Sequence, residues 1–140
     1  MNHFLDKDVE NMSDHVHSLT LSMVSIDCNP PFVVDGSKNS HSYGAGVIVS
    51  LDPPLIICDR DTVPIGISVI SITFQNTLTI SADLLFLHPF YNFAVLKFDI
   101  SDVFNAGIKI KAAEFDEKDL KIGETVNYVG LSGMLKTFRL

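Results

Sequence analysis

Apolar and polar residues alternate with a period of two along most of this chain, which is the pattern of β-strands with one buried face. The alternation is clearest in residues 67–74, where Ile70, Ile72 and Phe74 share one face and polar residues separate them. We expect strands in residues 19–27, 45–50, 55–58, 67–74, 77–87, 93–100, 108–115 and 125–131.

Two of these segments predict which side chains face inward and which face solvent. In the first, Leu19, Leu21 and Met23 fall on one face, and we expect that face to be buried. In residues 108–115, lysines alternate with isoleucines, as in an edge strand that turns its lysines to solvent. The chain should therefore form a sheet with one apolar face.

The segments between the strands carry turn residues. Prolines follow the first and second strands, where they fix φ and remove hydrogen-bond donors. Gln75 and Asn76 are expected to form a hairpin turn, and residues 88–92 another turn. Short strands, regular turn signals and the lack of a long helical pattern predict an all-β fold, an antiparallel barrel or sandwich.

The chain divides into three parts by composition. Residues 1–17 are polar and lack a sustained apolar period, so we expect a linker or flexible N-terminal segment. Residues 18–133 carry the strand pattern and should form the barrel. Residues 134–140 are expected to be a truncated C-terminal segment.

Composition excludes several classes of protein. The 140 residues are 46% apolar and 19% charged, which fits a folded domain and not a disordered chain. The net charge of -7 and the absence of a Lys/Arg cluster argue against nucleic-acid binding. No apolar run is long enough for a bilayer, and the N-terminus lacks the features of a signal peptide. The two cysteines, Cys28 and Cys58, are expected to be free thiols in a reducing, intracellular compartment.

Five stretches of the sequence resemble, in order and spacing, the first barrel of HtrA/DegP-type, trypsin-like serine proteases. They are "SYGAGVIVS", "PPLIICDRDTVP", "ISVISITF", "LFLHPFYNFAVLKFD" and "LKIGETVNYVGLSG". The second and fourth are most similar to the degenerate second protease-like region of the large fungal nuclear HtrA-like proteases implicated in apoptosis. The resemblance implies a trypsin-like antiparallel β-barrel, mainly the N-terminal barrel of the two-barrel fold.

The same resemblance bears on catalysis, because a serine triad needs a histidine base, an acid to orient it and a nucleophile. It implies that Asp61 stands at the histidine position and Asn92 at the aspartate position. Aspartate is not an imidazole base, and asparagine carries no charge to stabilise an imidazolium. The family's nucleophile motif would lie beyond this chain. We therefore expect no catalytic residue, no cofactor and no metal here.

Asp59, Arg60 and Asp61 remain as a candidate site. They could form a recognition patch at the former active-site cleft. Alternatively, Arg60 pairs with a neighbouring acid and ties the strand end to the next turn, an exposed arrangement of small energetic value. We favour the structural interpretation.

Three functional hypotheses follow. The first is a non-catalytic, protease-derived scaffold or protein-binding part of a larger nuclear, pro-apoptotic HtrA-like serine protease with associated PDZ domains. The second is a part of an active serine endopeptidase whose triad is supplied elsewhere in the polypeptide. The third is an independent peptide-binding module, because half of a two-barrel fold leaves strand edges open. The expected partners are other domains of the larger polypeptide, protein or peptide clients, and a second copy of the chain; nucleic acid and membrane are not expected.

Other chemically suggestive residues have simpler interpretations. Ser132 in "GLSG" lacks the second glycine of a nucleophile turn, since Met134 stands there. Cys58 lies in an apolar strand beside an acid and is expected to be a buried core residue, while His88 should bond backbone in its turn. His15 and His17 could chelate a metal on a strand, but they lie in the expected linker without a further ligand cluster, so we expect solvated side chains.

Two further segments resemble ligand loops only in part. The "GAG" at residues 44–46 lacks the helix and glycines of a phosphate loop, so we expect close backbone packing at a barrel strand. Residues 114–124 are rich in acids but lack the spacing of a calcium loop, so we expect a solvated turn.

Overall fold

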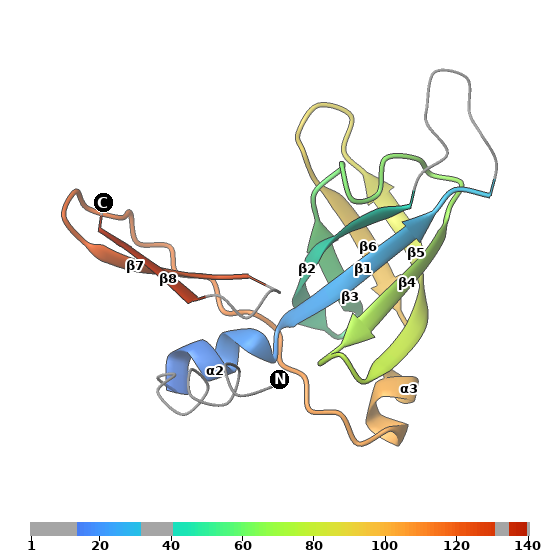
Figure 1. The fold of residues 1–140 in the computed structure, drawn as a ribbon, viewed down its shortest axis with the longest axis horizontal. Coiled ribbons are helices and arrows are strands. Elements are labelled where there is room, and N and C mark those ends of the chain that lie inside the picture. The colour runs from blue at the N-terminus through green and yellow to red at the C-terminus, as the bar shows by residue number, and fades with distance from the viewer. Residues whose placement is uncertain (1–13, 32–40, 131–134, 140) are drawn as a thin grey trace, which may run out of the picture.

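A computed structural model describes residues 14–31, 41–130 and 135–139 of the chain. Most of its ordered structure is β, and two short helices accompany the strands (Figure 1). The elements are α2 (Asp14–Thr20), β1 (Met23–Asn29), β2 (Ser42–Leu51), β3 (Pro54–Cys58), β4 (Val69–Phe74), β5 (Leu78–Leu87), β6 (Ala94–Phe98), α3 (Ile100–Asn105), β7 (Thr125–Val129) and β8 (Leu135–Arg139).

Six strands close into an antiparallel barrel in the order β1-β2-β3-β6-β5-β4. Four of the six pairings join strands that follow one another along the chain. The other two, β3 with β6 and β1 with β4, join strands that are distant in sequence and close the barrel. The predicted all-β class and antiparallel barrel are confirmed.

The first strand differs from the prediction in its start and in its buried face. Residues up to Thr20 form α2, and β1 begins only at Met23. Val24, Ile26 and Cys28 point into the core, whereas Met23 is half-buried on the outer face. The predicted buried face was therefore wrong. Met23 and Val24 are both apolar, so the alternation along the sequence allows either of them to face inward, and in the structure Val24 does.

The β4–β5 hairpin confirms the predicted turn. Gln75 and Asn76 have φ of 49° and 53°, and Thr77 N–H donates to the Phe74 carbonyl at 2.9 Å. Positive φ at both central positions is the turn whose twist matches that of the paired strands. Ile70, Ile72 and Phe74 are buried on β4, as the alternation predicts.

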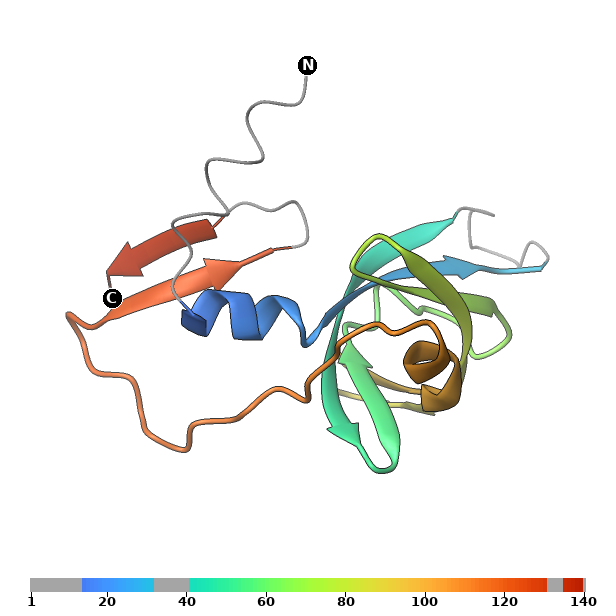
Figure 2. The ribbon, with the colours of Figure 1, turned by 90° about the horizontal axis from the view of Figure 1, so that it is seen from below.

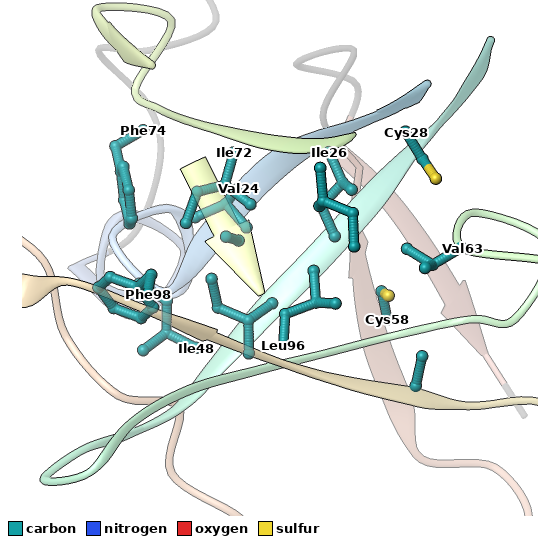
Figure 3. Close-up of a cluster of buried hydrophobic side chains, with 14 of the residues drawn as sticks. Val24, Ile26, Cys28, Ile48, Cys58, Val63, Ile72, Phe74, Leu96 and Phe98 are labelled. Atoms are coloured by element: carbon teal, nitrogen blue, oxygen red, sulfur yellow. The ribbon is translucent and has the colours of Figure 1, made fainter. Parts of the chain in front are cut away.

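The barrel interior is a continuous apolar core, and Figure 3 shows residues from β1, β2, β3, β4 and β6 converging in it. The largest fully buried side chains are Phe74, Ile26, Ile48, Ile56, Ile72, Leu96 and Val24. Gly46 on β2 has no room for a side chain: a Cβ there would lie 2.6 Å from Ile56 Cγ2 and 2.7 Å from Ile26 Cδ1. The close backbone packing expected at residues 44–46 is confirmed.

The end of the barrel at Phe74 and Phe98 is covered by residues that follow β6. Asp99 caps α3 by accepting a hydrogen bond from Ser101 N–H at 2.9 Å, and Val103 of α3 is fully buried. Beyond α3, Ile108 and Ile110 pack against the core.

Residues 108–115 were predicted to be an edge strand, and this was wrong. The segment alternates as expected, but the barrel is already closed and offers no edge for a ladder. Lys111 N–H instead donates to Leu21 C=O, and Ala113 N–H to Ile48 C=O.

Strands β7 and β8 form a separate two-stranded antiparallel sheet, which lies apart from the barrel near α2 (Figures 1 and 2). The strand expected at 125–131 is thus present, but it pairs outside the barrel. The domain boundaries at residues 17 and 133 stay predictions. Among the described residues, no helix is long and apolar enough to span a membrane.

Candidate functional site

The turn after β3 presents Asp61 at the surface of the barrel. Asp59 Oδ1 accepts a hydrogen bond at 2.7 Å from Thr62 N–H, three residues further on, and this bond holds the turn. Thr62 and Val63 are buried at 2% and 0% exposure and anchor the far side of this turn. Asp61 is therefore held, exposed, at a turn fixed on both sides.

The turn after β5 is organised by His88. Its Nδ1 accepts hydrogen bonds from Phe90 N–H at 3.1 Å and from Tyr91 N–H at 2.9 Å. Its ring also packs against Tyr91 and Phe93, with centroids 4.8 and 4.7 Å away. The predicted backbone-bonding role of His88 is confirmed, and Nδ1 must carry a lone pair and not a proton.

Arg60 links the two turns. Its backbone N–H donates to Asn92 Oδ1 at 2.9 Å, and its Nη1 donates to the Pro89 carbonyl at 3.1 Å. The tie from strand end to next turn is as the structural interpretation expected, but its acceptors are an amide and a carbonyl. The acidic partner proposed for Arg60 does not occur among the described residues.

The linked turns border an open surface hollow of about 260 Å³. Its lining residues are Arg60, Asp61, Pro64, Phe90, Tyr91 and Asn92. The structure thus brings together Asp61 and Asn92, which stand 31 positions apart in the sequence (92 − 61). Asn92 Oδ1 is already engaged by Arg60 N–H. The residues that line the hollow include no serine, threonine or cysteine nucleophile and no histidine base.

Cys58 lies close to this region but is buried in the core. Burial, the neighbouring charge of Asp59 and the nearby Cys28 raise the pKa of the Cys58 thiol from 9.0 to about 12. A thiol with this pKa stays protonated and is a poor nucleophile. The prediction that Cys58 is a core residue is confirmed, and both cysteines are free thiols in the structure.

The remaining sequence candidates do not gather into a site. His15 and His17 lie on helix α2 and not on the strand considered for them. Among the described residues, no three His, Cys, Asp or Glu side chains come close enough to hold a metal ion. Ser132 lies outside the described residues.

One pair was missed in the sequence. His41 Nδ1 lies 3.2 Å from Asp27 Oδ1, and the His41 ring stacks on Tyr43 with centroids 5.8 Å apart. The β1–β2 pairing places Asp27 opposite Tyr43, so only knowledge of the register could have found the pair. It is exposed and stands apart from the residues that line the hollow.

A closed six-stranded antiparallel barrel with a hollow between the β3 and β5 turns is the fold of trypsin-like protease barrels, and comparison with solved structures supports this class. The serine endoprotease from Yersinia pestis matches with a TM-score of 0.62 and 20% identity, over 87% of this chain and 41% of that one. The Rv3671c protease from M. tuberculosis in its active form matches with a TM-score of 0.60 and 16% identity, over 87% and 48%.

Among curated proteins, the similar sequences are named pro-apoptotic serine proteases. The protein NMA111 of Yarrowia lipolytica is 26% identical over 127 residues, 91% of this chain and 13% of the relative. NMA111 of Coccidioides immitis is 29% identical over 111 residues, 79% and 10%. The chain thus spans about a tenth of the length of these relatives. No family model matches it. The resemblance to HtrA-like, trypsin-fold serine proteases is confirmed.

Proposed function

We propose that this chain is a catalytically degenerate protease-type barrel that serves as a structural or protein-binding part of a larger HtrA-like serine protease. The observation that carries the proposal is the hollow in which Asp61 and Asn92 meet. By resemblance these are the positions of the catalytic histidine and aspartate. The proposal therefore gives the site a binding or packing role.

The chemistry of these two residues supports the loss of catalysis. A general base for a serine hydroxyl works best with a pKa near the operating pH, which imidazole provides and an exposed carboxylate does not. The acid of a triad orients and stabilises the imidazolium. Asn92 is neutral, and its Oδ1 instead accepts a hydrogen bond from Arg60 N–H, so it fixes the turn. Asn92 therefore holds the turn in place and does not stabilise an imidazolium.

The biological setting is proposed from the relatives alone. Because their names describe pro-apoptotic serine proteases, we infer that this chain belongs to a polypeptide of that kind, with nuclear residence as implied by the resemblance. PDZ-domain neighbours are inferred on the same ground. Locating a tagged full-length polypeptide in cells would test the compartment.

The test of degeneracy is a protease assay on the purified 140-residue chain with denatured casein as substrate. We expect no cleavage above that of a buffer blank, with an active trypsin-fold protease as positive control. Cleavage that copurifies with the chain and disappears in Asp61→Ala would refute the proposal. Cleavage that survives Asp61→Ala, Asn92→Ala and their combination would indicate a contaminant, which mass spectrometry of the sample would identify.

The binding role needs a separate assay. Phe90 and Tyr91 line the hollow and are 89% and 70% exposed, and aromatic side chains are common anchors for a partner. We expect extended peptides to bind saturably and Phe90→Ala to weaken them. Ile67→Ala, an equally apolar change at an exposed position outside the lining, is the control. A titration without saturation would leave only the structural role.

The second candidate function is participation in an active endopeptidase whose triad lies elsewhere in the polypeptide. It is favoured by the small share of the relatives that the chain spans. Asp61→Ala in the full-length polypeptide should then leave proteolysis unchanged, while Phe74→Ala, which damages this barrel, should reduce it if the barrel supports the active part. Loss of activity with Asp61→Ala at unchanged stability would contradict both candidates.

A further inference from the structure

The outer surface of the barrel carries a row of apolar side chains that crosses five strands. Met23, Val47, Ile57, Val95 and Phe86 stand directly opposite one another from β1 to β2, β3, β6 and β5 in turn. We call these five residues the outer row. Directly opposed side chains in antiparallel strands are about 5 Å apart. The outer row is therefore one continuous strip and not a scatter of single residues.

The strip faces away from the core. On β1, β2, β3 and β6 the members of the row lie between buried residues, whereas Phe86 lies at the bulge of β5 beside exposed Leu85. Val47, Ile57 and Phe86 are 36%, 37% and 47% exposed. The outward side of an antiparallel sheet normally carries polar residues. A contiguous apolar strip on that side marks a surface that another molecule covers.

A charged pair borders the strip on β5 and β6. Lys97 and Asp83 are directly opposite each other, and Lys97 stands two residues beyond Val95 on the same outward face of β6. The two strands thus present one apolar pair, Phe86 with Val95, beside two residues of opposite charge at paired positions, Asp83 and Lys97. Both charged residues are exposed.

We propose that this face, centred on β5 and β6, is the contact between two copies of the chain. Homodimers mostly use a two-fold axis, so the same patch must fit itself. A two-fold axis running between β5 and β6, parallel to the strands, lays each strand over the other strand of the second copy. Val95 then meets Phe86, and Lys97 meets Asp83, in both directions.

Electrostatics favours a second copy at this face over other faces. The chain carries a net charge of -7, so two copies repel one another where carboxylates prevail. The outer row has no charge, and the Lys97 and Asp83 pair has no net charge. This face allows close approach and adds two intermolecular ion pairs. The proposal is independent of the proposed function, since it uses none of the residues of the hollow.

The first test measures the oligomeric state of the full chain by sedimentation velocity over a range of concentrations. We expect a dimer that dissociates on dilution. Val95→Lys should raise the dissociation constant by about tenfold or more, because it puts a cation into the apolar centre of the contact. Val69→Lys on β4, at a position 61% exposed and outside the outer row, is the matched control and should leave the dimer unchanged. Circular dichroism on each variant confirms that the barrel is folded.

The second test does not depend on the tolerance of Val95 to substitution. Lys97→Asp leaves only carboxylates at the charged positions, and Asp83→Lys leaves only ammonium groups. Each variant alone should be monomeric, whereas an equimolar mixture should dimerise, and added salt should weaken the mixed dimer. An ion pair within one copy cannot produce this behaviour, so the mixture isolates the contact between copies.

Four outcomes would overturn the proposal. The first is a wild-type chain that stays monomeric at every concentration. The second is equal loss of dimer in Val95→Lys and Val69→Lys, and the third is a mixture that does not associate; either would place self-association on another surface. The fourth is protection of the outer row by a different region of the larger polypeptide in hydrogen exchange, which would assign that region as its occupant.

Discussion

The closed barrel and the two-stranded β7–β8 sheet are both antiparallel, but they differ in what their strands enclose. In the barrel every strand has a hydrogen-bonded neighbour on each side, and the strands surround an apolar core. In the β7–β8 sheet each strand has one neighbour, and Tyr128 is 60% exposed. Among residues 104–126 and 128–130, no apolar residue is buried. A two-stranded sheet on its own is marginal in water, so we expect closure around the barrel core, more than the β7–β8 pairing, to stabilise this chain.

The largest difference between the two regions is expected when one aromatic side chain is removed from each of them. Phe74→Ala in the barrel should lower the free energy of unfolding by about 3–5 kcal/mol, because it leaves a cavity in a fully packed interior. Tyr128→Ala in β7 should change it by about 0.5 kcal/mol or less, as expected for an exposed position. Urea unfolding followed by circular dichroism measures both. Similar losses for the two variants would mean that the β7–β8 sheet shares the cooperative core.

A smaller effect is expected at Gly46, where β2 packs closely against β1 and β3. Gly46→Ala puts a methyl group against Ile56 and Ile26 and should cost about 1–3 kcal/mol through overpacking. Gly66→Ala is the control, because a Cβ there meets only Leu84 Cδ2 at 3.8 Å, an ordinary contact. Thermal melting of the two variants compares them. A melting temperature of Gly46→Ala equal to that of the wild type would show that the neighbouring side chains shift to accommodate the added methyl group.

Because the Cys58 thiol is buried in the barrel, the free energy of unfolding should depend on pH at alkaline values. The thiol's folded pKa of about 12 lies above the ordinary value of 9.0, so the unfolded chain loses this proton first as pH rises. The contribution to stability is complete below pH 9.0 and is lost as the pH approaches 12. Urea midpoints across this range should fall less steeply in Cys58→Ala than in the wild type. Rapid labelling of native Cys58 by iodoacetamide would contradict the protected thiol.

The smallest effect on the barrel is expected from cutting the chain between the two regions. Residues 114–122 have no regular structure, and Lys118 and Lys121 are exposed there. Trypsin should cleave at these lysines before Lys97, whose backbone lies in the β6 ladder. The barrel fragment should melt within a few degrees of the intact chain. A large drop in its melting temperature would show that β7 and β8 stabilise the barrel after all.

Some features of the hollow were predicted from the sequence, and others were not. Asp61 and Asn92 were found by resemblance, and the position of each at a strand end follows from local turn residues. Their meeting depends on the β3–β6 pairing, which joins distant segments. The role of Arg60 as a link between turns was anticipated, but not its acceptors at Pro89 and Asn92, because hydrogen-bond partners depend on the packed geometry.

Alternation and backbone preference within a few residues specify most of the strands, the hairpin turn at Gln75 and Asn76, and the inward face of β4. Features that need distant segments to meet depend on the packed barrel. It set the inward phase of β1, where Leu19, Leu21 and Met23 alternate as regularly as Val24, Ile26 and Cys28. Residues 108–115 form no strand, because a closed barrel has no free edge to which a strand could add. They pack over one end of the barrel instead.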